Sequence, residues 1–307
     1  MKLFLFRRLA QRKIWTRIFR ERLTEPLHLN LWSLFVWAFG SYRAKIDYDL
    51  VVRQNNAYCI LKAADFARSQ NIRTVSLIEF GVASGTGLLN MAQIAGQVTR
   101  ATGVSFKLYG FDSGQGMPPA RDYRDHPDLY QQGDFAMNQD ELKKHLPANV
   151  HLIIGEVAKT IPEFISRLSP AEPVGYVVFD LDYYFSMRDA LKILQDANPE
   201  KYLPITLTYL DDIALDEHNS YCGELLAVNE FNAENPLRKI ERNAFFENAR
   251  IFRRALWLKQ IFFFHVLDHP SRSRIQVIDN KRAMFNPYLK FEGNRDNLNF
   301  EKEARKD

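Results

Sequence analysis

The chain has 307 residues, of which 46% are hydrophobic and 25% are charged. This composition excludes an intrinsically disordered protein, because it supplies enough apolar side chains to fill a large core. The two cysteines, Cys59 and Cys222, lie far apart and form no C-x-x-C pattern. The sequence therefore supports neither a disulfide framework nor a zinc site, and a reducing cytoplasm is the expected location.

The net charge of +4 hides an asymmetry along the chain. Residues 1–45 contain ten Lys or Arg and only two acidic residues, Glu21 and Glu25, so the remainder is net negative. Arg12–Arg20 has apolar and basic side chains on opposite helical faces, which predicts an amphipathic helix that packs on its own domain or lies on a membrane. Nucleic-acid binding is not expected, because the rest of the chain is acidic and has no basic stripe interleaved with aromatic residues.

The apolar stretch Leu27–Phe39 is interrupted by polar residues and is shorter than the roughly 20 residues that a membrane-spanning helix needs. A secretory signal is not expected either, since arginines recur through the first 22 residues. We therefore expect residues 1–47 to form a helical N-terminal extension. This extension is expected to contact a membrane surface or a second copy of the chain.

Helices and strands are predicted to alternate after this extension. Helical periodicity covers Tyr48–Gln70, and five short apolar runs that follow are typical of parallel strands covered on both faces. These runs are Val75–Phe80, Phe106–Phe111, Val150–Ile154, Gly175–Phe179 and Ile205–Leu210. The helices predicted between them are Leu88–Thr99, Asn138–His145, Ala158–Leu168 and Ser186–Asp196. The alternation predicts a doubly wound, mostly parallel α/β sheet within residues 48–280.

Fewer elements are predicted beyond the fifth strand. Gly223–Ala233 is a helix candidate, Trp257–Leu267 is a strongly apolar strand candidate, and Arg274–Ile278 is a candidate to pair with it. Residues 281–307 are polar with scattered aromatic residues, which predicts a loosely attached tail.

The run from Glu79 to Gly87 predicts a ligand-binding loop between the first strand and the next helix. Its glycines, Gly81, Gly85 and Gly87, are spaced G-x-x-x-G-x-G, so the backbone can turn sharply and approach a ligand closely. Dinucleotide loops have the spacing G-x-G-x-x-G, whereas the close pair comes last here, which favours S-adenosylmethionine over NAD. We expect Glu79, the three glycines and Ser84 to contact this cofactor. An ordinary strand-to-helix turn is the alternative.

Further acidic residues follow the other strands, and the carboxyl ends of parallel strands are where ligands bind in such sheets. Asp112 ends the second strand and is the candidate to accept the ribose hydroxyls, with Ser113 beside it. Glu156 follows the third strand and is expected to border the adenine ring, although a solvated glutamate is an alternative. Asp180, which follows the fourth strand, is expected near both the cofactor and the acceptor.

Asp180, Asp211 and Asp212 follow two strands that are predicted to be adjacent. Converging carboxylates repel one another unless a cation, a proton or an arginine intervenes, and no arginine within these motifs is placed to do so. Carboxylate oxygens suit a hard cation such as Mg²⁺. The alternative is that one aspartate caps a helix and the others are solvated. For the general base, Asp182 and His218 are the candidates. His265 and His269 could also line the site, although an isolated histidine in such a run is more often structural.

Four sequence blocks, in this order, resemble the macrocin O-methyltransferase group of class I S-adenosylmethionine-dependent methyltransferases. They are Ile78–Val82, Tyr109–Ser113 with Gly116–Pro118, Asp180–Ser186 and Asp211–Asp212. The resemblance implies a seven-stranded, Rossmann-like methyltransferase sheet with a reversed final strand. It also implies methylation of a hydroxyl on a sugar or another small acceptor, with Asp180, Asp211 and Asp212 as metal ligands.

The chain departs from that group at three places. Tyr202–Pro204 stands where a paired-glycine turn is usual, Ile213 replaces an aromatic residue, and Met187 replaces a threonine. These departures leave the cofactor loop intact and affect the acceptor side. A binding or scaffold protein that keeps the fold without turnover is the first alternative function, and a nucleotide-linked oxidoreductase ranks last because its glycine loop is absent.

Overall fold

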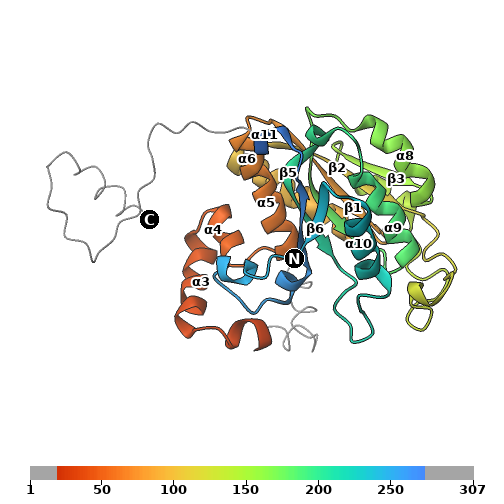
Figure 1. The fold of residues 1–307 in the computed structure, drawn as a ribbon. Coiled ribbons are helices and arrows are strands. Elements are labelled where there is room, and N and C mark those ends of the chain that lie inside the picture. The colour runs from red at the N-terminus through yellow and green to blue at the C-terminus, as the bar shows by residue number, and fades with distance from the viewer. Residues whose placement is uncertain (1–18, 274–307) are drawn as a thin grey trace, which may run out of the picture. The chain divides into compact units, whose positions relative to one another are not determined.

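The computed structural model describes residues 19–273, and these residues contain a seven-stranded sheet with the order β3-β2-β1-β4-β5-β7-β6 (Figure 1). The first five strands pair in parallel, and β7 runs antiparallel to both β5 and β6. The strands are β1 (Thr74–Phe80), β2 (Ser105–Asp112), β3 (Val150–Ile154), β4 (Val174–Phe179), β5 (Tyr202–Leu210), β6 (Arg238–Glu241) and β7 (Ile261–Val266). This is the seven-stranded sheet with a reversed final strand that the sequence resemblance implies.

All five predicted parallel strands are present, and β5 begins three residues earlier than expected. The strand predicted over Trp257–Leu267 is wrong in its first part, because Leu256–Gln260 forms the 3-10 helix η6 and only Ile261–Val266 is extended. Its partner is β6, which the sequence did not predict. The proposed partner Arg274–Ile278 lies outside the described residues.

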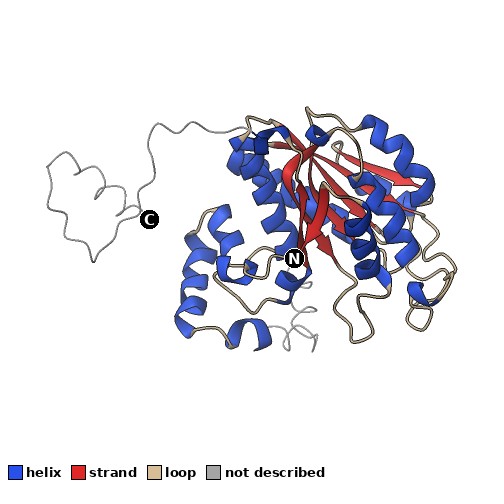
Figure 2. Ribbon diagram, viewed as in Figure 1, coloured by secondary structure: helices blue, strands red, loops and turns tan. Residues whose placement is uncertain are grey.

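Helices cover both faces of the sheet (Figure 2). On one face, α5 and α6 share a buried apolar cluster with Leu77 of β1. On the other, α8, α9 and α10 share a second cluster with Ile78, the next residue along the same strand. Such alternation is what a strand buried on both faces produces. The remaining α-helix bounds are α5 (Gln54–Ser69), α6 (Thr86–Thr102), α7 (Gln139–His145), α8 (Val157–Arg167), α9 (Tyr184–Leu191), α10 (Gly223–Glu234) and α11 (Pro270–Ser273).

The N-terminal region is helical, as predicted, and contains η1 (Phe19–Leu23), α3 (Leu27–Phe39) and α4 (Tyr42–Asp47). It belongs to the same compact unit as the sheet. The guanidinium of Arg22 donates to the carbonyls of Tyr48 and Asp49, and Arg250 forms a buried 2.8 Å ion pair with Asp49. These bonds join the extension to the segment before β7.

Several predictions about the ends of the chain are not tested by the described residues. Most of the predicted amphipathic helix Arg12–Arg20 and the predicted tail, residues 281–307, lie outside them. Among residues 19–273, no helix combines the length and apolarity needed to cross a membrane.

Candidate active site

The loop from β1 to α6 is shaped by its glycines. Gly81 has a φ of +81°, and a Cβ added to it would lie 1.7 Å from the carbonyl oxygen of Asp180. The loop after β1 and the loop after β4 therefore touch at a position where only glycine fits. Gly85, with a φ of +80°, packs against Leu142, and Gly87 packs against the carboxyl group of Glu79. Gly85 and Gly87 thus also serve the local fold.

Glu79 is buried beneath the first turn of α6. Burial, and next the charge of Asp180, raise the pKa of its carboxyl group from 4.5 to about 8. Its Oε2 atom is buried and accepts no hydrogen bond from the described part of the chain. The carboxyl group of Glu79 therefore lies beside the first turn of α6. The unpaired N–H groups at the start of a helix favour a polar ligand.

Asp112 connects the loops after β1 and β2. Its Oδ2 atom accepts the Ala83 N–H at 2.8 Å, and its Oδ1 atom accepts the Gly114 N–H at 2.7 Å. Each carboxylate oxygen has a second lone pair, so both keep capacity to accept from a ligand. The hydroxyl of the neighbouring Ser113 donates to the Gly116 carbonyl at 2.9 Å, so it is used within the turn.

Ser84 and Glu156 lie at the margins of this loop region. The hydroxyl of Ser84 is 2.9 Å from that of Thr86, the first residue of α6. Glu156 follows β3, is largely exposed and pairs with Lys159 at 3.0 Å. Both side chains are accessible to solvent.

The three aspartates predicted as metal ligands come together. One carboxylate oxygen from each of Asp180, Asp211 and Asp212 lies within 4.8 Å of the others. They meet because β4 and β5 are parallel neighbours, with Phe179 opposite Leu210 at their ends. Tyr209 donates its hydroxyl to Asp211 at 2.8 Å, which orients that carboxylate.

Burial and neighbouring carboxylates raise the pKa values of two members of this cluster, Asp180 and Asp212. The pKa of Asp180 rises from 3.8 to about 8, through burial first and then through Asp211 and Asp182. Burial and the neighbouring Glu224 raise the pKa of Asp212 well above its ordinary value. A cation or proton that reached this edge of the sheet would relieve the repulsion.

Sequence reasoning missed two charged residues of the site. Glu224 is buried at the start of α10, and its carboxylate accepts the N–H groups of Leu181 at 3.5 Å and Asp212 at 3.3 Å. Arg53, immediately before α5, lies near enough to lower the pKa values of Glu79 and Asp180. The sequence prediction concerned only arginines within the motifs, and Arg53 lies outside them. Arg53 has a φ of +55°, and no sequence signal marks it.

The two general-base candidates lie near one another. Asp182 is buried with a φ of +55°, and its side chain hydrogen-bonds with Tyr130. Its pKa is raised, mainly by burial, while His218 acts to lower it. The pKa of His218 is lowered by burial and then by His126, whose ring lies 5.2 Å away. His218 Nδ1 faces the Leu215 N–H at 3.4 Å, and Nε2 is buried with no partner among the described residues.

The late histidines are placed differently. His265 pairs with Ile205 in the first half of β5, whereas the carboxylates follow the end of that strand at Leu210. His269 lies beyond β7 and contacts Ser271 at 2.7 Å. The expectation that His265 lines the site is therefore wrong, because β7 runs antiparallel to β5 and carries it to the opposite edge of the sheet.

No protein-family model matches the chain, and no curated protein matches its sequence. Among solved structures, it is similar to the O-methyltransferase NovP, with 17% identity, a TM-score of 0.47 and coverage of 69% of this chain and 79% of that chain. It is also similar to the calicheamicin methyltransferase CalS11, with 20% identity, a TM-score of 0.43 and coverage of 66% and 83%. A third is MycE of the mycinamycin pathway, in complex with Mg, SAH and mycinamycin VI, with 13% identity, a TM-score of 0.34 and coverage of 66% and 48%.

All three proteins are described as methyltransferases. The similarity concerns the general arrangement of the fold, and the chain spans about half the length of MycE. The methyltransferase-like fold is established by the strand order and by the reversed β7.

Proposed function

We propose that the protein is an S-adenosylmethionine-dependent O-methyltransferase that acts on a hydroxyl of a sugar or another small acceptor. One observation carries this proposal: the glycine loop and the three-aspartate cluster meet at one edge of the sheet. Gly81 touches the backbone of Asp180 there, so the two parts of the site are in direct contact. A cofactor in the loop and an acceptor at the cluster would be neighbours, as group transfer requires.

The residues of the loop suit the proposed cofactor. Glu79 offers a buried oxygen without a protein partner. Asp112 keeps one acceptor site on each oxygen, and these are suited to a pair of ribose hydroxyls. Arg53, a cation that acts on both Glu79 and Asp180, is suited to a carboxylate such as that of a bound amino acid. Ser84 and Glu156 would border the ligand.

The donor set of the cluster suits a divalent cation. Three carboxylates with no Cys or His among them match the oxygen ligands that Mg²⁺ prefers. S-adenosylmethionine, when bound, supplies an electrophilic methyl group, and a cation supplies positive charge that lowers the pKa of a bound hydroxyl. Asp180, Asp211 and Asp212 would hold that cation, and Glu224 would position Asp212 through its backbone N–H.

Asp182 and His218 are proposed to take the hydroxyl proton as a pair. Burial, and next the neighbouring His126, lower the imidazole pKa of His218, which favours its neutral form. A neutral imidazole close to a carboxylate can accept a proton and is then stabilised as a cation.

A transfer assay tests the proposal. The full chain is incubated with methyl-labelled S-adenosylmethionine and a panel of sugars, nucleotide sugars and phenols, with Mg²⁺ or with excess chelator. We expect label on a hydroxyl oxygen, and strong loss of transfer in Asp211→Asn and Asp112→Asn. Failure of the protein to bind S-adenosylmethionine or its demethylated product would contradict the proposal, whichever acceptor is offered.

A further inference from the structure

Helix α3 exposes most of its apolar side chains. Only Ser33 and Val36 of its 13 residues are buried. The large apolar residues that are between 54% and 78% exposed are Leu27, Leu31, Trp32, Leu34, Phe35, Trp37 and Phe39. Such a dense group of exposed apolar residues is unusual on a folded domain and marks an interaction surface.

The exposed residues occupy most of the circumference of the helix. At about 100° per residue, they span roughly 220° of arc, whereas a helix that packs on one protein face needs an apolar stripe of about 100°. The flat surface of a second copy would cover only part of this arc. A fluid apolar medium can contact all of it, and tryptophans such as Trp32 and Trp37 are enriched where lipid meets water.

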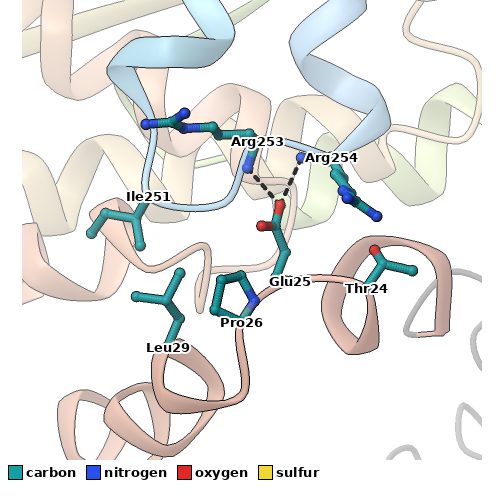
Figure 3. Close-up of a pocket in the computed structure, with 7 residues that line it drawn as sticks. All are labelled: Thr24, Glu25, Pro26, Leu29, Ile251, Arg253 and Arg254. Atoms are coloured by element: carbon teal, nitrogen blue, oxygen red, sulfur yellow. Dashed lines mark hydrogen bonds between the residues drawn. The ribbon is translucent and has the colours of Figure 1, made fainter.

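A cationic cavity adjoins the start of α3 (Figure 3). It has a volume of about 580 Å³, and its lining residues are Thr24, Glu25, Pro26, Leu29, Ile251, Arg253 and Arg254. Glu25 accepts the backbone N–H groups of Arg253 at 2.7 Å and Arg254 at 2.9 Å. Both arginine side chains are exposed, and neither guanidinium forms an ion pair within residues 21–273. The two guanidinium groups are therefore available to an anion.

The sequence that precedes α3 is also positively charged, like Arg253 and Arg254. Residues 1–20 contain seven Lys or Arg and no acidic residue. Basic residues beside an exposed apolar helix attract the anionic headgroups of phospholipids, while the apolar side chains enter the acyl region. At 13 residues, α3 is about 20 Å long, too short to cross a hydrocarbon core, so it would lie along the surface.

We infer that α3, together with Arg253 and Arg254, is a binding surface for a membrane that contains anionic phospholipids. Membrane binding through this surface is independent of methyl transfer. The enzyme would be held at a lipid surface, with its acceptor in solution or in the membrane.

Vesicle flotation with the full chain tests this inference. The vesicles contain phosphatidylcholine alone or phosphatidylcholine with phosphatidylglycerol. We expect the wild type to float with both and more strongly with the anionic vesicles. The double variant Leu31→Gln/Phe35→Gln should lower partition onto both by at least roughly tenfold, because it removes two apolar anchors. Arg253→Gln/Arg254→Gln should lower only the anionic preference, by roughly tenfold.

A matched control is Leu215→Gln/Phe135→Gln, which removes a leucine and a phenylalanine of similar exposure from loops away from α3. It should float like the wild type, and circular dichroism should show that all variants are folded. The inference is wrong if the wild type remains unbound with both vesicles, or if the control loses binding as much as the α3 variant does. It is also wrong if sedimentation shows a dimer that Leu31→Gln/Phe35→Gln dissociates and no protein floats, since α3 would then be a subunit interface.

Discussion

Hydrogen bonds hold the loop after β1 against the loop after β2, whereas the loops after β4 and β5 bring negatively charged side chains together. Asp112 accepts backbone N–H groups from both of its loops, at 2.8 Å and 2.7 Å. The other half of the site contains Asp180 and Asp212, whose pKa values rise because burial and neighbouring carboxylates disfavour their charge. Backbone hydrogen bonds to Asp112 fix the first half, whereas the second half gathers carboxylates whose repulsion a cation or proton would relieve.

The largest effect should come from the point where the two halves touch. Gly81→Ala would place a Cβ atom 1.7 Å from the Asp180 carbonyl oxygen, so the loops must separate. We expect loss of cofactor binding and a decrease in the free energy of unfolding of more than about 2 kcal/mol, measured by denaturant titration. The control is Gly103→Ala, which has a similar φ of +80° and no atom within 4 Å of the added Cβ.

In Gly103→Ala, the free energy of unfolding should fall only by the cost of placing alanine in a left-handed backbone conformation, about 1–2 kcal/mol. This control should retain cofactor binding. Equal losses in the two variants would mean that backbone strain alone matters. The contact between the two halves would then have no special role.

The charged half is tested by Asp211→Asn, which removes one proposed metal ligand. We expect Mg²⁺ affinity and methyl transfer to fall by at least about tenfold, because one of three anionic ligands is lost. Cofactor affinity should change little. Asp216→Asn removes an exposed charge from the same loop and should leave both properties unchanged. Full activity of Asp211→Asn in excess chelator would argue against a metal at this position.

The pH dependence of the protein's stability should reveal the raised pKa of Glu79. The pKa of Glu79 is about 8 in the folded chain and near 4.5 when unfolded, so the folded state binds more protons between these values. Its contribution to stability is fully present below about pH 4.5 and is lost as the pH rises through about 8. Glu79→Gln should therefore flatten the decline in stability over this range, by an amount on the order of a few kcal/mol.

Thermal melts of the wild type and Glu79→Gln across this pH range measure the effect. Parallel curves for the two proteins would show that Glu79 ionises normally. The control is Glu156→Gln, which changes an exposed glutamate in the same half of the site.

The smallest effect concerns His218. His126 is the second cause that lowers the His218 pKa, after burial. If His218 must be neutral to accept a proton, activity falls as the pH drops through its pKa. His126→Gln should raise that pKa and move the acid limb of the activity profile to higher pH. An unchanged acid limb would assign the proton transfer to Asp182 alone.

The sequence predicted the site residues that come together because they follow neighbouring strands of the sheet. Asp180 and Asp211 converge because they follow adjacent parallel strands, and short apolar runs identify those strands. The sequence did not predict β6. This edge strand has four residues, three of them charged, so its hydrophobicity pattern resembles that of a loop. Arg53 and Glu224 were missed because tertiary packing, rather than a local motif, brings them to the site.

The most direct test of the account is calorimetric titration of the wild type with S-adenosylhomocysteine, with and without Mg²⁺. We predict binding in both conditions, a strong reduction in Asp112→Asn, and little change in Asp211→Asn, because the cofactor half is complete without the charged half. The absence of heat with this ligand and with S-adenosylmethionine, together with a clear signal for NAD, would contradict the account.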